Sequence, residues 1–282
     1  MDESMKLVFD VGMHKGEDTD YYLKKGFRVV SFEADPDLAE LCRKRFSEQL
    51  KTGQLHIVEG AIVDLEKHQS SDGKIRFFKN KKSSVWGTVV DDWAERNTKL
   101  GSDSEIIEVA IIDFAACIRQ YGMPYYLKID IEGMDVICLK ALRGFTERPA
   151  YISIESEKIS FDKLSEEFRI FTELGYDAFQ TVNQIKVTDQ KEPKNTTEGN
   201  YLGYRFSKGS SGLFGTDLNK SDWKSLDQSL KRYKEIFNGY KYLGDDGKFT
   251  KFLLGRLFSK ATNRLFGIPG WYDTHARHSS VK

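Results

Sequence analysis

The residues best suited to chemistry lie in the sequence VFDVGMHKGEDT, residues 8–19. A short apolar run contains Asp10, and Gly12 and Gly16 enclose three residues before a polar, helix-compatible stretch begins. Glycine permits a tight turn in which the backbone comes close to a ligand, and a helix that starts there directs its amide groups at that ligand. The spacing therefore predicts a loop that holds an adenosine cofactor.

Two acidic residues favour one adenosine cofactor over another. A nicotinamide fingerprint reads GxGxxG and rests a pyrophosphate on the helix N-terminus. Asp10 stands where that pattern has its first glycine, and a carboxylate there would repel a pyrophosphate but attract the ammonium of an amino acid. Glu33 ends a second predicted strand, where a carboxylate can accept hydrogen bonds from both ribose hydroxyls. The pattern favours S-adenosylmethionine over NAD.

A second group of ionisable residues lies in YYLKIDIEG, residues 125–133. Lys128, Asp130 and Glu132 alternate along a predicted strand and would share one face, at the end of the strand where open α/β sheets bind ligands. Charges that face a core are costly unless paired, so we expect them to reach a wet cleft, which Glu155 would flank from the next strand. The alternative is that the lysine and the aspartate form a structural ion pair.

A bound S-adenosylmethionine would present a sulfonium, whose methyl group an acceptor must approach in line; if the acceptor is a hydroxyl, its proton must also be removed or acidified. Two routes are open for this chain. In the first, Asp130, Glu132 or His275 is the general base, the histidine being a candidate because of its aromatic and acidic neighbours in GWYDTHAR, residues 270–277. In the second, Asp130 and Glu155 hold a Mg²⁺ ion that binds a vicinal diol and acidifies one hydroxyl.

The elements that would position these residues alternate between strands and helices over the first 185 residues. Strand patterns cover 6–12, 27–36, 55–63, 73–80, 105–114, 125–133, 150–157 and 176–184, and helix patterns cover 17–26, 37–53, 134–142 and 161–175. Strands separated by helices of about 10–15 residues require a mostly parallel sheet with helices on both faces. We expect an α/β fold with a doubly wound, mostly parallel Rossmann-like sheet in a domain of residues 1–185.

The rest of the chain, residues 186–282, has a different character. Two polar loops, 188–200 and 207–215, precede a helix-compatible region, 220–266. Within it, 248–266 carries an apolar stripe opposite Lys and Arg, which packs on the fold or on a second subunit, or lies on a membrane surface. We expect a helical C-terminal extension that covers the substrate and contributes to a homodimer.

The composition narrows the class of protein. The 43 Lys and Arg balance 43 Asp and Glu, which argues against a chain that grips nucleic acid along its length. Residues 186–282 nevertheless hold 18 basic against 10 acidic side chains, a balance that suits either a solvated helix face or a surface for an anionic or polyhydroxylated partner. No apolar run approaches the roughly 18 residues of a membrane span, no signal-peptide pattern is present, and three cysteines without a CxxC pair fit a reducing compartment. We expect a cytoplasmic protein.

The sequence resembles the FkbM family of S-adenosylmethionine-dependent methyltransferases. The resemblance rests on residues 8–36, on EGAIVD at 59–64, and on YLKIDIEGMD at 126–135, which is similar to the KIDxEG signature of that family. It implies a class I methyltransferase sheet, S-adenosyl-L-methionine as cofactor, and O-methylation of a small-molecule acceptor such as a sugar or a natural product.

The resemblance also implies roles for individual residues. Those expected to line the methionine and ribose part of the cofactor are Asp10, Gly12, Met13 and Gly16. Glu33 would hold the ribose, and Ala34, Ala61 and Ile62 would surround the adenine. Many relatives have GANxG where this chain has GMHKG, so the middle of the loop departs from the family pattern.

Two other functions are compatible with the sequence. A nicotinamide- or nucleotide-sugar-dependent oxidoreductase or epimerase on a similar sheet would bind a pyrophosphate, which the position of Asp10 disfavours. A non-enzymatic binding module on a methyltransferase core would engage a partner through its basic C-terminal region; loss of Asp10 or Glu33 would support it, and both are present.

Overall fold

The computed structural model describes residues 5–68, 72–80, 87–89, 104–131, 133–157, 160–243, 262 and 271–281. The chain divides into two compact units, Met1–Ile152 (unit 1) and Ser153–Lys282 (unit 2). The division falls within a strand, whereas the change in composition predicts a boundary after residue 185.

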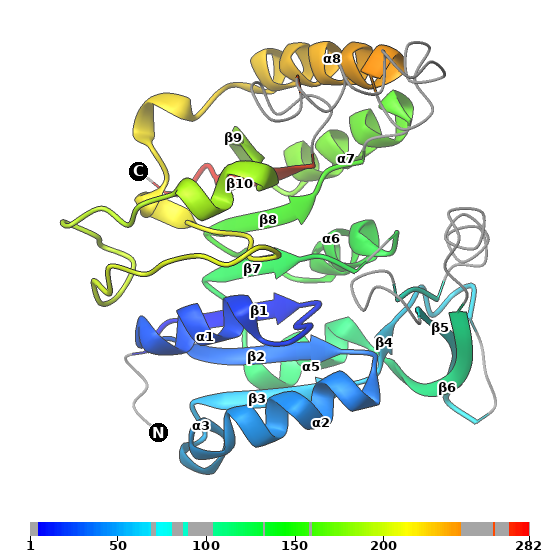
Figure 1. Ribbon diagram of the computed structural model, residues 1–282. Coiled ribbons are helices and arrows are strands. Elements are labelled where there is room, and N and C mark those ends of the chain that lie inside the picture. Colours follow the sequence, from blue (N-terminus) through cyan, green and yellow to red (C-terminus); the bar gives the residue numbers. More distant parts are fainter. Residues whose placement is uncertain are drawn as a thin grey trace. The chain divides into compact units, whose positions relative to one another are not determined.

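A seven-stranded sheet has the order β3-β2-β1-β7-β8-β10-β9 (Figure 1). Its strands are β1 (Leu7–Val11), β2 (Arg28–Glu33), β3 (Leu55–Glu59), β7 (Tyr126–Ile129), β8 (Tyr151–Glu155), β9 (Tyr176–Asn183) and β10 (Tyr272–His278). β1 pairs in parallel with β2 and β7, β2 pairs in parallel with β3, and β10 pairs with β9 antiparallel. The expected doubly wound, mostly parallel α/β sheet is confirmed.

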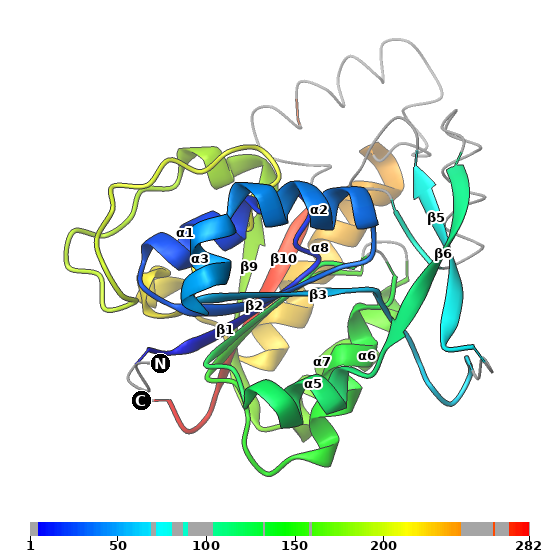
Figure 2. The ribbon, with the colours of Figure 1, turned by 90° about the horizontal axis from the view of Figure 1, so that it is seen from below.

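The helices of unit 1 cover both faces of β1, β2 and β3. They are α1 (Glu17–Lys24), α2 (Pro36–Arg45), α3 (Ser47–Thr52), α5 (Phe114–Tyr121) and α6 (Asp135–Ala141), with a 3-10 turn, η2, at Leu142–Gly144. Figure 2 shows α1, α2 and α3 on one side of these strands and α5 and α6 on the other. Every residue of β1 is buried, and the ring of Phe9 lies 5.4 Å from that of Phe32 and 6.1 Å from that of Phe114.

The predicted helix over 37–53 is two helices, because the chain leaves helical geometry at Phe46. That residue has φ −110° and ψ 30°, ends α2 and precedes α3. Its ring fills the space beside Gly16, where a Cβ would lie 2.4 Å from Cε2 of the ring. The break therefore places an aromatic side chain against the loop that follows β1.

A second, three-stranded sheet follows β3 and has the order β4-β6-β5. It consists of β4 (Ala61–Ile62), β5 (Lys74–Asn80) and β6 (Ser104–Ile112), and the antiparallel pair β5 and β6 is called the β5–β6 ribbon below. The two strand predictions for this region are confirmed. Most of the predicted surface excursion between them, 81–104, lies outside the described residues, apart from 87–89, where Thr88 bridges to Phe78.

Unit 2 packs two helices, α7 (Phe161–Glu173) and α8 (Leu226–Leu243), with β9 and β10. Three 3-10 turns lie between β9 and α8: η3 (Gln184–Asp189), η4 (Gly215–Asp217) and η5 (Lys220–Asp222). Its core contains Phe168, Phe179 and Tyr233, whose rings are in contact.

Two predictions for the C-terminal region meet different outcomes. Part of the helix-compatible region 220–266 forms α8, whereas the amphipathic stretch 248–266 lies outside the described residues except for Thr262. The aromatic and polar ending 270–277 contains a strand, β10, with Thr274 and Ala276 fully buried. None of the helices in the described part of the chain is long and apolar enough to cross a membrane.

Candidate functional site

The loop between β1 and α1 turns tightly against the ends of two strands. The amides of Gly12 and Met13 both donate to the carbonyl of Phe32, at 3.1 and 2.9 Å, which joins the loop to β2. Gly12 has φ +86° and Gly16 has φ +79°. A Cβ on Gly12 would lie 1.9 Å from the backbone oxygen of Asp130, so only glycine lets the chain after β7 pass this close.

Asp10 and Lys128 form a buried ion pair beneath this loop. The Asp10 side chain has no exposed surface; its Oδ2 accepts from Thr19 Oγ1 at 2.5 Å, and its Oδ1 lies 3.2 Å from Lys128 Nζ. The same ammonium donates to the carbonyl of Gly12 at 2.7 Å. Asp10 thus stabilises the loop. Because the Asp10 side chain is buried, the expected contact between it and the ammonium of a ligand is not favoured.

The electrostatics of Lys128 follow from its neighbours. Burial lowers its pKa, but the nearby carboxylates, first Asp10 and then Asp130, outweigh that effect and raise the pKa above the ordinary value. Asp130 Oδ2 lies 3.8 Å from Nζ, and the Asp130 side chain is 45% exposed. Lys128 is therefore part of an ion pair, as the structural alternative predicts, while Asp130 still reaches solvent.

Of the three residues predicted to share one face of a strand, only Lys128 lies within β7 in the described part of the chain. β7 ends at Ile129 because the chain then turns into the loop before α6, so Asp130 follows the strand. Its amide still donates to the carbonyl of Val11 at 2.9 Å, which fixes its backbone beside β1. Glu132 lies outside the described residues, and its predicted role as a base stays a prediction.

Glu33 ends β2 and is almost fully buried. Its Oε2 accepts from the amide of His14 at 2.7 Å, and its Oε1 accepts from the amide of Asp35 at 2.8 Å. Burial raises the pKa of Glu33 to about 7, although the two amides act in the opposite direction. An ionised carboxylate has about four acceptor positions, so each oxygen can also accept from a ribose hydroxyl. The site therefore suits a vicinal diol.

The residues expected around an adenine are brought together by the second sheet. Ala34 follows Glu33 and packs against a buried cluster formed by Ala61, Val63, Phe77 and Val109, together with Met134. Ile62 is next to Ala61 on β4 and is also buried. Sequence reasoning missed the contribution of Phe77, because the ribbon that carries it is distant in sequence from β2.

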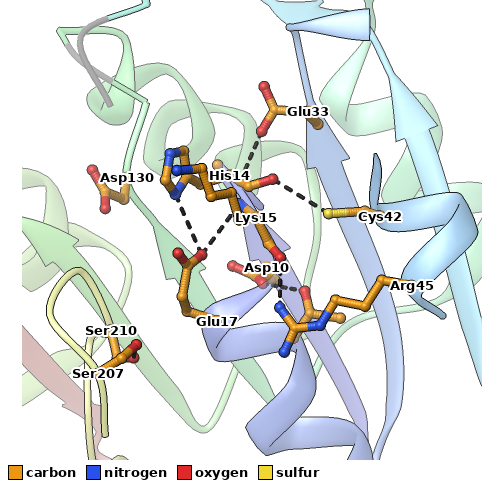
Figure 3. Close-up of polar contacts among 12 residues, drawn as sticks. Asp10, His14, Lys15, Glu17, Glu33, Cys42, Arg45, Asp130, Ser207 and Ser210 are labelled. Atoms are coloured by element: carbon orange, nitrogen blue, oxygen red, sulfur yellow. Dashed lines mark hydrogen bonds and ion pairs between the residues drawn. The ribbon is translucent and has the colours of Figure 1, made fainter. Parts of the chain in front are cut away.

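The middle of the loop, where the family pattern is not followed, is held by α1 and α2 (Figure 3). His14 has φ +52° and places its Nδ1 3.3 Å from Glu17 Oε2. Its carbonyl accepts from Cys42 Sγ at 3.3 Å, and the next carbonyl, that of Lys15, accepts from Arg45 Nη1 at 2.6 Å. The local sequence gave no signal for the cysteine and arginine contacts, which come from the other helix.

His275 and Glu155, the remaining candidates, belong to unit 2. His275 is 2% exposed on β10 beside Gln180 of β9, and burial lowers its pKa to about 3. An enclosed imidazole of this kind is not suited to take a proton from a substrate, so the structure does not support His275 as the base.

The predicted magnesium ligands also receive no structural support. Glu155 ends β8 and is partly buried, in unit 2, whereas Asp130 is in unit 1. Within the described ranges, no three His, Cys, Asp or Glu side chains are grouped so that they could hold a metal ion. The proposal of a catalytic Mg²⁺ ion therefore rests on the sequence alone.

Comparison with known proteins finds a matching family model and several similar proteins. A model of the methyltransferase FkbM domain matches residues 10–178. A probable ribosomal RNA small subunit methyltransferase A from Methanospirillum hungatei is 33% identical over 63 residues, which are 22% of this chain and 25% of that protein. The match thus spans about a quarter of the length of that curated relative.

Two solved structures are similar over nearly the whole chain. The precorrin-6y C5,15-methyltransferase from Geobacter metallireducens has 10% sequence identity and a TM-score of 0.38, over 98% of this chain and 81% of that one. The StiE O-MT has 10% identity and a TM-score of 0.40, over 99% of this chain and 70% of that one. The domain match, however, covers more than half of the chain and contains the loop, Glu33 and Lys128. The chain belongs to the FkbM family of S-adenosylmethionine-dependent methyltransferases.

Proposed function

We propose that this chain is an O-methyltransferase that acts on a hydroxyl of a sugar or a natural product. Family membership supports methyl transfer, and Asp130 carries the choice of a hydroxyl as acceptor. Its backbone is fixed against Gly12 and Val11, while its carboxylate is 45% exposed beside the cofactor loop. A half-exposed carboxylate at the end of a central strand is suited to take the proton of an alcohol.

The residues of unit 1 fit S-adenosylmethionine. Glu33 has acceptor capacity for the ribose hydroxyls, and Ala34 and Ala61 provide apolar surface for an adenine. Gly12 carries no side chain where the loop passes the backbone of Asp130, after β7. When bound, the cofactor supplies an electrophilic methyl group on a sulfonium.

The proton balance assigns a role to Asp130. Methyl transfer forms an oxygen–carbon bond, breaks the carbon–sulfur bond with its electron pair remaining on sulfur, and releases the hydroxyl proton. Asp130 accepts this proton and passes it to solvent, which its exposure allows. General-base catalysis of this kind contributes about 10²–10⁴-fold to a rate.

The experiment that tests this proposal measures transfer of labelled methyl groups to a panel of hydroxylated sugars and natural products, with RNA as a further acceptor. We expect Asp130→Asn to lower kcat by about 10²–10⁴-fold and to leave the Kd for S-adenosylhomocysteine within about twofold of the wild type. Asp177→Asn, which changes an exposed aspartate on β9, is the matched control and should keep wild-type activity.

Each other outcome has a defined meaning. A wild-type protein that binds S-adenosylhomocysteine but methylates no hydroxyl, or methylates only RNA, contradicts the proposed acceptor. An Asp130→Asn variant with normal kcat contradicts the proposed base. Activity that is lost in EDTA and restored by Mg²⁺ would favour the metal route through Asp130 and Glu155.

A further inference from the structure

The β5–β6 ribbon is joined to the Glu33 site by one charged side chain. Lys79, on β5, places its Nζ 2.9 Å from Asp35 Oδ1 and also contacts Asp37 Oδ2. The Asp35 side chain is only 6% exposed and that of Lys79 is 25% exposed, so this pair is shielded more than an ordinary surface salt bridge. The two residues are 44 positions apart in the sequence.

Asp35 connects this ion pair directly to Glu33. Its amide donates to Glu33 Oε1 at 2.8 Å, and its own Oδ1 accepts from the amide of Asp37 at 2.9 Å and so caps α2. Two buried carboxylates thus lie within two residues of each other. The charge of Asp35 is, after burial, one of the factors that raise the pKa of Glu33. Lys79 supplies the positive charge that offsets Asp35.

The same strand also supports the apolar side of this corner. Phe77 precedes Lys79 by two residues and lies on the same face of β5, because side chains alternate along a strand. Its ring belongs to the cluster that contacts Ala34 and contains Ala61. The ribbon therefore contacts the segment Glu33–Asp35 twice, through packing at Ala34 and through charge at Asp35.

We propose that Lys79 is a positioning residue of the cofactor site, which pairs with Asp35, holds the segment Glu33–Asp35 in place and keeps the Glu33 carboxylate available to the ribose hydroxyls. Lys79 acts through Asp35 and does not itself contact the cofactor. The inference rests on the proposed function, because it takes Glu33 as the residue that holds the ribose.

Among the residues that the structure describes, the other titratable groups near Glu33 are His14 of the loop, Asp35 and Cys42 of the α2 region, and Glu59, which pairs with Glu33 in the register of β2 and β3. The Cys42 thiol is neutral near pH 7 because burial, and then the charge of Glu33, raises its pKa to about 12. Glu59 lies 2.7 Å from Arg43 Nη2, which neutralises it. Asp35 is therefore the anion near Glu33 whose charge is offset by a residue of the β5–β6 ribbon, Lys79.

The test is calorimetric titration with S-adenosylhomocysteine between about pH 6 and pH 8.5, because Glu33 changes charge near pH 7. We expect Lys79→Met to move the pH midpoint of affinity upward by about 0.5–1 unit and thereby to weaken binding at pH 7 about two- to fivefold, because less of the Glu33 carboxylate is then ionised at that pH. Lys79→Arg should restore both values. Lys74→Met is the matched control. Lys74 is an exposed residue at the start of β5, away from the end of the strand where Lys79 contacts Asp35.

A second background distinguishes charge from structure. In an Asp35→Asn protein, which keeps a residue that caps helices well, Lys79→Met should no longer move the midpoint. A Lys79→Met protein with wild-type affinity and midpoint would overturn the inference, and so would weaker binding with an unchanged midpoint. If the wild type does not bind S-adenosylhomocysteine at all, the proposed function fails first, which the wild-type titration alone reveals.

Discussion

The conformation of the loop between β1 and α1 depends on Gly12. We predict that Gly12→Ala lowers stability by more than the roughly 1–3 kcal/mol of a strained backbone conformation, because its Cβ would also meet the Asp130 carbonyl at 1.9 Å. Binding of S-adenosylhomocysteine should fall with it. Gly73→Ala is the control: it has φ +69° but no heavy atom within 4 Å of the added Cβ, so it should show the strain alone. Equal losses in urea unfolding would contradict the close approach.

Glu33 predicts a pH dependence of cofactor binding. Its pKa is raised from the ordinary value of 4.5 to about 7, so the free protein increasingly holds the protonated form as the pH falls through 7. A protonated carboxyl cannot accept from both ribose hydroxyls at once while it also accepts from two amides. Affinity for S-adenosylhomocysteine should therefore be constant above about pH 8 and fall up to tenfold per pH unit below 7. An affinity that does not change over this range would count against the role of Glu33.

Strand β7 is attached to the loop after β1 by the ammonium of Lys128, and this attachment predicts a coupling between two residues. Lys128→Met leaves the Asp10 carboxylate buried without its cation and should cost about 3–5 kcal/mol of unfolding free energy. Adding Asp10→Asn removes the buried charge, so the double variant should lose less than the sum of the single variants. Urea unfolding of all four proteins measures the coupling, and additive losses would show that the two groups do not interact.

Helix α8 is attached to β10 by hydroxyl groups. Tyr233 Oη lies 2.7 Å from Thr274 Oγ1 and 2.5 Å from Ser156 Oγ, and those two hydroxyls lie 2.7 Å from each other. We predict that Tyr233→Phe costs about 1 kcal/mol, because the remaining two groups still bond to each other. Tyr242→Phe, on the same helix but 42% exposed, should change stability by less than about 0.5 kcal/mol. A similar loss for both variants in thermal or urea unfolding would contradict the attachment.

At the scale of the whole molecule, the sequence predicted those structural features that are determined by residues close together in the chain. The alternation of strands and helices gave the sheet, and the glycine spacing gave the turn between β1 and α1. The position of Glu33 at the end of β2 followed from the same alternation. Each of these is decided by residues that are near one another in the chain, so periodicity and backbone freedom are enough to find them.

Features that depend on contacts between residues far apart in the sequence could not be predicted from these local patterns. Asp10 carries a charge in a position that suggested a ligand, and only the pairing of β1 with β7 brings Lys128 to it. His275 belongs to a polar segment, YDTHARH, whose composition hides a buried strand beside β9. Nothing in the sequence around Lys79 indicates its contact with Asp35.

The central claim is that unit 1 binds the methyl donor with Glu33 as its ribose acceptor, and calorimetric titration with S-adenosylhomocysteine tests it most directly. The wild type should bind, and Glu33→Ala should weaken binding by about 1–3 kcal/mol, the range for a lost charged hydrogen-bond acceptor. Glu108→Ala, at an exposed position on the β5–β6 ribbon, should bind as the wild type does. Absence of binding to the wild type, binding of NADH in its place, or an unchanged affinity in Glu33→Ala would contradict the account.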